Sequence, residues 1–351
     1  MHPFRKLLLI SLGRASSFEK DPTPRDWAKL FNMARQQTLT GVLYDCLLQL
    51  PESQQPPQHI LDEWRQITER IARVYAGHEQ HVGELEEILH RLGLHGSILK
   101  GTGLARLYPA PERRMCGDID LLVGGTHESI IQAFEDADYP VYDVIYQECK
   151  AGIFLDTEVE IHFHASKMYN PFRNARLQRY FNAHTPIRQD ADITYPDLRF
   201  NAVFCMAHMF RHYLEGGIGL RQMMDYYFVL RALDPSDRAP VMRDLRDLGM
   251  ADFTAATMLS LQFNFGLEDE YLLCSPDRKR GPKLIDDMIR MGNFGVMDSR
   301  NYSPDKESSL ARFNRKNRRV FSHLRFYPGE VVWSPFARLS QWGWRKVKGY
   351  L

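Results

Sequence analysis

Two acidic residues, Asp118 and Asp120, open a short apolar run that continues through residues 121–123. Side chains on a strand alternate between its faces, so both carboxylates point the same way, about 6.6 Å apart along the strand. Two flexible carboxylates at that spacing can converge on one divalent ion, or bracket two ions about 3.5–4 Å apart. Because an unpaired buried charge is costly, a metal, a basic partner or a solvated sheet edge must compensate this pair.

A second short segment, Lys100, Gly101 and Thr102, follows an apolar pair upstream of the two acids. Glycine lets the backbone approach a ligand closely, and Thr102 offers a hydroxyl at the expected start of a short helix over residues 103–107. The free N–H groups at a helix N-terminus form a ready anion site. The order of strand, Gly-Thr turn, short helix and Asp-x-Asp strand resembles the signature of the polymerase-β-like nucleotidyltransferase superfamily.

Within that superfamily the sequence is most similar to the uncharacterised nucleotidyltransferase family, over roughly residues 80–230. One departure is the spacer between Gly101 and Asp118, which is slightly longer than in the general superfamily pattern. The motifs that carry the resemblance are Leu99-Lys100-Gly101, Tyr108-Pro109, Arg113 or Arg114, residues 118–123, residues 159–162 with Glu160, His208 with His212, and residues 219–221 with Asp225.

The resemblance implies a metal-dependent enzyme that moves a nucleoside monophosphate from an NTP to an acceptor and releases pyrophosphate. Carboxylates suit Mg²⁺ or Mn²⁺, and such transfer depends on positioning and on neutralising phosphoryl charge. Glu158 shares the expected face of Glu160 and competes for its role. The implied catalytic and metal-binding residues are Asp118, Asp120 and Glu160, and the implied nucleotide contacts are Lys100, Gly101, Thr102, Arg114 and Arg221.

Several of these side chains also have structural interpretations. Lys100 and the arginines can form salt bridges to the two aspartates when no metal is bound, and Arg114 is preferred to Arg113 as the phosphate contact. Arg221 and Asp225 are four residues apart on an expected helix, so they are either an ion pair or part of the cleft.

The histidines support a different hypothesis. His162, His208 and His212 are interpreted as polar residues that line the cleft, but together with His164 they could also form a four-histidine metal site. The alternatives to the transferase are therefore a non-catalytic nucleotide-binding sensor or scaffold on the same fold, and a histidine-metal hydrolase.

The periodicity of apolar residues predicts an α+β fold, with a small mixed sheet flanked by N-terminal and C-terminal helical regions. We expect helices over residues 26–34, 41–50, 60–76, 83–92, 127–137, 201–214 and 222–233, with Gly93 as a stop and Thr126 as an N-cap. Strands are expected near residues 96–99, at 141–146 and 152–155 as a hairpin, and at 157–165. The predicted regions are 1–93 (helical), 94–168 (nucleotidyltransferase core), 169–300 (helical) and 301–351 (basic, Trp-containing tail).

Composition sets the remaining limits. The net charge of +1 identifies no partner, and five scattered cysteines without a C-x-x-C motif favour a reducing cytoplasm. The N-terminal apolar run is interpreted as the first amphipathic helix, and no run reaches the roughly 20 apolar residues of a membrane span.

The tail of residues 301–351 holds eleven Lys and Arg against three Asp and Glu. It suits a nucleic-acid backbone, an interfacial helix, or a helix packed on the acidic body. The acceptor therefore stays open among a small molecule, RNA, a protein and a carbohydrate.

Overall fold

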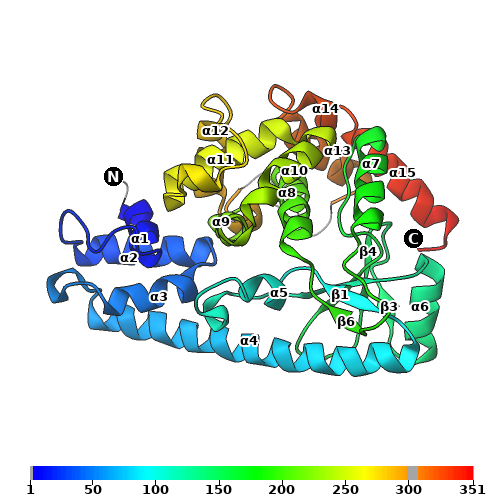
Figure 1. Cartoon of the computed structure of the whole chain (residues 1–351), viewed down its shortest axis with the longest axis horizontal. Coiled ribbons are helices and arrows are strands. Elements are labelled where there is room, and N and C mark those ends of the chain that lie inside the picture. Colours follow the sequence, from blue (N-terminus) through cyan, green and yellow to red (C-terminus); the bar gives the residue numbers. More distant parts are fainter. Residues whose placement is uncertain (1–2, 299–306, 351) are drawn as a thin grey trace.

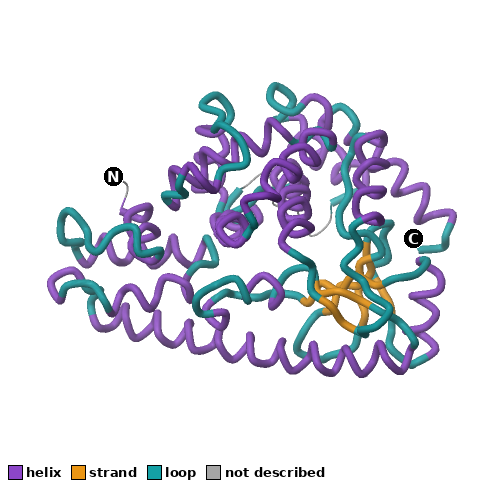
Figure 2. The backbone as a smooth tube through the Cα atoms, viewed as in Figure 1, coloured by secondary structure: helices purple, strands orange, loops and turns teal. Residues whose placement is uncertain are grey.

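The computed structural model describes residues 3–298 and 307–350, and it confirms the predicted fold class. A six-stranded mixed sheet lies at one end of the molecule, and helices make up most of the remainder (Figures 1 and 2). Part of the predicted basic tail, residues 301–306 and 351, lies outside the described residues, as do residues 299–300 of the predicted helical region.

The N-terminal region is helical, as predicted. The apolar run forms α1, which buries Phe4, Leu7 and Leu8 as the first helix of the described chain. Thr23 caps the next helix by accepting a hydrogen bond from the Asp26 backbone N–H, and the Asp26 carboxylate accepts one from the Thr23 backbone N–H. The helices are α1 (Pro3–Ser11), α2 (Pro24–Gln36) and α3 (Thr40–Leu48).

The expectation of two separate helices at 60–76 and 83–92 was wrong. The chain forms one helix of 35 residues, α4 (Gln58–Leu92), which runs beneath both the N-terminal helices and the sheet (Figure 1). A glycine inside a helix costs only about 1 kcal/mol relative to alanine, so Gly77 and Gly83 weaken the helix without ending it. The predicted stop is confirmed, because Gly93 takes the left-handed conformation with φ 64°.

The sheet has the strand order β3-β4-β5-β2-β1-β6. β2 pairs parallel to β5 and antiparallel to β1, whereas β4 pairs antiparallel to both β3 and β5. The strands are β1 (Gly96–Ile98), β2 (Ile119–Val123), β3 (Val141–Tyr142), β4 (Glu148–Ala151), β5 (Val159–His162) and β6 (Ile193–Thr194), and the short α5 (Thr102–Ala105) lies between β1 and β2.

Two details of the sheet differ from expectation. The predicted hairpin of residues 141–146 and 152–155 is instead formed by β3 and β4, so its second strand lies earlier in the chain. The two-residue strand β6 was not predicted, because so short a segment carries no recognisable alternation and depends on parallel pairing with β1.

The alternation of β2 and β5 sorts their side chains onto two faces. Ile119, Leu121 and Ile161 pack against α4 and α6 (His127–Asp136), which Thr126 caps as predicted. The opposite face carries Asp120, Glu160 and His162, and it turns towards the C-terminal helices. The sheet is therefore a middle layer, with its acidic face beneath a helical cover.

The C-terminal region returns to helices, which bury the largest apolar cluster. α8 and α9 confirm the helices expected near residues 201–214 and 222–233. The tail also packs on the body, because Val320, Tyr327 and Val331 belong to the main core. The helices are α7 (Pro171–Ala183), α8 (Leu198–Glu215), α9 (Leu220–Ala232), α10 (Pro235–Asp247), α11 (Ala251–Phe265), α12 (Gly281–Met291), α13 (Ser309–Phe321), α14 (Pro328–Val331) and α15 (Ser334–Val347).

Within residues 3–298 and 307–350, no helix combines the length and the apolar character needed to cross a bilayer.

Two helical glycines provide a matched test of how closely α3 packs against the backbone of Arg113. A Cβ at Gly41 in α3 would overlap the backbone carbonyl oxygen of Arg113, whereas a Cβ at Gly77 in α4 meets no atom within 4 Å. We expect Gly41→Ala to lower the free energy of unfolding by about 1–3 kcal/mol. Gly77→Ala should raise it by about 0.5–1 kcal/mol. Urea unfolding followed by circular dichroism measures both, and equal stability of the two variants would contradict this account of the α3 contact.

Candidate active site

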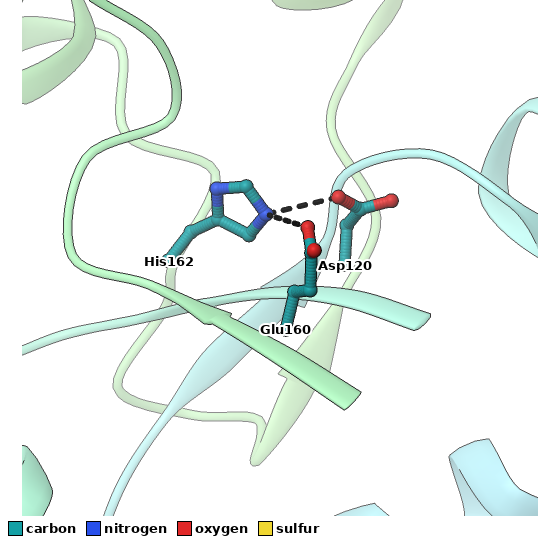
Figure 3. A group of neighbouring side chains, drawn as sticks. All are labelled: Asp120, Glu160 and His162. Carbon is teal, nitrogen blue, oxygen red and sulfur yellow. Dashed lines mark hydrogen bonds and ion pairs between the residues drawn. The ribbon is translucent and has the colours of Figure 1, made fainter. Parts of the chain in front are cut away.

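The register of three strands brings four polar side chains together on the face of the sheet opposite α4. Asp120 and Glu160 are direct neighbours in the parallel β2–β5 pair, and Glu148 of β4 is opposite His162 of β5. His162 Nε2 is 2.9 Å from Asp120 Oδ1 and 3.7 Å from Glu160 Oε2 (Figure 3). One imidazole therefore contacts carboxylates from two strands.

Asp120 is the most enclosed of these acids, with 1% of its surface exposed. Lys100 Nζ is 2.7 Å from Asp120 Oδ1, the oxygen that also contacts His162. Burial opposes ionisation, but the Lys100 charge and the His162 contact outweigh it and hold the pKa of Asp120 well below its usual range. Burial also disfavours the charged form of His162, yet the hydrogen bond to Asp120 and the ion-pair contact with Glu160 raise its pKa to about 9.

Asp118 is half-buried and lines the same cavity. The neighbouring charge of Asp120, together with burial, raises the pKa of Asp118 to about 6. Negative charge is therefore in local excess even with Lys100 beside it.

This donor set fits a hard divalent cation. Ligand atoms of Asp120, Glu160 and His162 all lie within 4.8 Å of one another. Carboxylate oxygens are the ligands that Mg²⁺ and Mn²⁺ prefer, and a cation here would relieve the repulsion between Asp118 and Asp120.

The turn that follows β1 forms another part of the cavity wall. Gly101 has φ 59° and ψ −120°, a conformation that favours glycine, and it lines the cavity beside Lys100. Thr102 is buried and begins α5, which is shorter than the helix expected over residues 103–107. The backbone of this turn thus lies next to the acidic strand.

Arg114 lies in the cavity wall and forms an ion pair with Asp225, another residue of that wall. Its Nε and Nη2 donate to the two carboxylate oxygens of Asp225 on α9, at 2.7 and 2.8 Å, and its Nη1 donates to the carbonyl of Gly101 at 3.1 Å. Tyr108 donates to the same Asp225 carboxylate at 2.6 Å. The sequence left Arg221 open between an ion pair with Asp225 and a place in the cleft. In the structure Arg221 donates to the Met115 carbonyl at 2.8 Å and lines the cavity.

The neighbouring Arg113 points elsewhere. It forms a two-point ion pair with Asp45 of α3, with both N···O distances at 3.0 Å. The structure therefore places Arg114 at the cavity and Arg113 against the N-terminal helices.

The predicted cleft histidines divide into two groups. His208 and His212 of α8 line the cavity with His162, and burial lowers the pKa of both α8 histidines well below its usual value. The predicted position of His164 was wrong, because β5 ends at His162 and His164 stacks on Tyr146 instead.

The proposed four-histidine metal site is therefore not formed, because His164 lies away from His162, His208 and His212. In the described part of the chain, the group with metal-binding spacing holds a single histidine, His162. Glu158 is exposed and pairs with Lys150 at 2.8 Å, so the structure places Glu160, and not Glu158, at the cavity.

Sequence reasoning missed several residues of the cavity wall. Glu148 was assigned to the turn of the expected hairpin, although Glu148 and Lys150 alternate with buried Cys149 and Ala151, a strand signal. Arg211, Gln222 and Phe294 also line the cavity. These three carry no local signal, because tertiary folding alone brings α8, α9 and the segment after α12 over the sheet.

The two adjacent arginines allow a matched test of the buried pair. Arg114→Leu leaves the Asp225 carboxylate buried without a cation, and we expect unfolding free energy to fall by about 3–5 kcal/mol. Arg113→Leu removes a partly exposed pair and should cost about 1 kcal/mol or less. Chemical denaturation gives both values. A second change, Asp225→Leu, should recover part of the loss in Arg114→Leu, and equal costs for the two single variants would refute the assignment.

Comparison with known proteins gives one match. A family model described as an uncharacterised nucleotidyltransferase matches residues 23–266, well over half of the chain. No curated protein and no solved structure matches.

Proposed function

This chain belongs to the uncharacterised nucleotidyltransferase family, and from that premise we propose that it transfers a nucleoside monophosphate from an NTP to an acceptor. The observation that carries the proposal is the meeting of Asp118, Asp120 and Glu160 at one cavity with Lys100 and Gly101. An arrangement of carboxylates beside a cation and a glycine turn suits a metal-bound triphosphate.

In the proposed reaction, an acceptor oxygen attacks the α-phosphorus of the NTP. The bond from that phosphorus to the bridging oxygen breaks, and pyrophosphate leaves with the bonding electrons. Asp118, Asp120 and Glu160 would hold Mg²⁺ or Mn²⁺, which supplies charge neutralisation for the phosphoryl group. The contact with His162 at 3.7 Å lowers the pKa of Glu160, so an ionised carboxylate is present to orient the acceptor hydroxyl and take its proton.

The neighbouring cations then have distinct roles. Lys100 pairs with Asp120 in this structure and would contact phosphate when a nucleotide binds. Arg114 holds the carbonyl of Gly101, so its effect on the nucleotide passes through the Gly101–Thr102 turn. Arg221 faces the cavity and is the second proposed nucleotide contact.

We assign the reaction to the cytoplasm. Support comes from the five cysteines, all of which are free thiols in the structure.

The first test compares acidic residues on and beside the cavity. We expect Asp118→Asn to reduce transfer by on the order of 100-fold or more and to leave the fold intact, because it removes one proposed metal ligand. Glu160→Gln should have a similar effect, whereas Glu158→Gln, an exposed control just before the same strand, should retain activity. The assay incubates α-labelled NTPs, Mg²⁺ or Mn²⁺ and a cell extract as the acceptor pool.

The outcomes of this assay separate the hypotheses. Label that reaches an acceptor with wild type and not with Asp118→Asn supports transfer. Full activity in Asp118→Asn would refute the assignment. Metal-dependent NTP binding without label would favour the nucleotide-binding sensor or scaffold, and tightly bound stoichiometric zinc would favour the hydrolase.

A further inference from the structure

A second cavity lies between α7 and α15, which are neighbours near the C-terminus, on the right of Figure 1. Its volume of about 470 Å³ is in the range of small-molecule sites. Its wall includes Trp333, the N-cap of α15, together with Phe336 and Trp344 of the helix itself. Tyr146, from the segment between β3 and β4, contacts the Trp344 ring edge to face. Aromatic faces of this kind stack on flat rings.

Positive charge exceeds negative charge at this cavity. Lys167, Arg338 and Glu215 line it, and Arg211 lies directly behind Lys167 in a smaller adjoining hollow. Among the described residues, the Lys167 ammonium has one hydrogen bond, to Gln341 Oε1 at 3.4 Å. The Glu215 carboxylate accepts from Tyr169 at 2.9 Å. Glu330 lines the adjoining hollow and pairs with Arg173 at 3.3 Å, so Glu215 is the acid that shares this cavity with Lys167 and Arg338.

The arginines also retain unused donors. The Nε atoms of Arg211 and Arg338 are buried, and in the described structure neither has a hydrogen-bond partner. Burial and the Arg211 charge lower the pKa of Lys167 to about 8, which reflects the same local excess of positive charge. An anion bound in the α15 cavity would lie beside Lys167 and Arg338, the two cations that line it.

This cavity shares a wall with the candidate active site. Tyr146 lines the α15 cavity, and Glu148, two residues later, lines the catalytic one. On the last turns of α8, Arg211 and His212 face the catalytic cavity and Glu215 faces the α15 cavity. Nearby residues of the same two segments therefore line the two cavities.

We infer that the α15 cavity binds the acceptor, and that this acceptor is a small organic anion, such as a phosphate monoester, attached to a ring. Its anionic group contacts Lys167 and Arg338, and its ring stacks on Trp344 and Tyr146. The identity of this ligand as the acceptor rests on the proposed transferase function; the binding site itself does not.

The test measures binding of three probes to the whole chain by calorimetry: phenyl phosphate, glucose 6-phosphate and inorganic phosphate. At least one ring-bearing probe should bind, and more tightly than inorganic phosphate. If phenyl phosphate binds more tightly than glucose 6-phosphate, the preferred ring is aromatic, and the reverse order identifies it as a sugar. Lys167→Met should raise its dissociation constant about tenfold or more, and it should keep the fold because it removes a cation without a carboxylate partner.

Matched controls come from the same helix. Trp344→Ala should also weaken binding, whereas Trp342→Ala and Lys346→Met should not, because Trp342 is exposed on the outer face of α15 and Lys346 lies over its ring. Asp118→Asn should bind the probe like wild type, so loss of transfer in that variant is separable from loss of this site.

Two results would overturn the inference. One is the absence of binding by both ring-bearing probes at millimolar concentration. The other is an unchanged dissociation constant in Lys167→Met. In the labelled-NTP assay, retained NTP binding with lost labelling in Lys167→Met would support the acceptor role, and unimpaired labelling would refute it.

Discussion

The ion pair between Arg114 and Asp225 joins the two walls of the candidate active site. Arg114 lies just before the acidic strand, and Asp225 lies on α9 in the helical cover. The same guanidinium holds the carbonyl of Gly101, and the same carboxylate accepts from Tyr108. Since both partners are almost fully enclosed, each depends on the other for its charge compensation. The turn, the acidic strand and α9 are thus positioned together.

The carboxylates themselves depend on strand register. A shift of one residue between β2 and β5 would move Asp120 or Glu160 away from its neighbour, and would turn Leu121 or Ile161 out of the core. Burial of apolar residues on the α4 side therefore fixes the acids on the other side. Lys100 and His162 contact the Asp120 carboxylate and stabilise its ionised form within a nearly closed environment.

Much of this site follows from short-range patterns, and the remainder depends on tertiary contacts. Alternation predicts one face for Asp118 with Asp120 and one face for Glu160 with His162. The β2–β5 register then places Asp120, Glu160 and His162 on the same face of the sheet. Where the strand ends is a tertiary property, which is why His164 was misplaced. The partner of Arg114 is 111 residues away, so spacing along the chain offered only the local alternative, Arg221 with Asp225.

The position of the basic tail was likewise not predictable from the sequence alone. Its composition suits nucleic acid, an interface or the protein body, and charge alone does not distinguish them. The apolar residues Val320, Tyr327 and Val331 are buried in the main core, so α13 and α14 are part of the body. α15 then forms one wall of an aromatic cavity.

The continuous helix α4 has a consequence for how the molecule unfolds. Ile60 and Trp64 in its first half belong to the large helical core, whereas Leu85 and Leu89 in its second half belong to the core beneath the sheet. With a rise of about 1.5 Å per residue, this helix spans roughly 50 Å. Loss of either core removes tertiary support from a helix that the other core also needs. The helical region and the sheet should therefore melt as one cooperative unit, and a proteolytic cut within α4 would destabilise both.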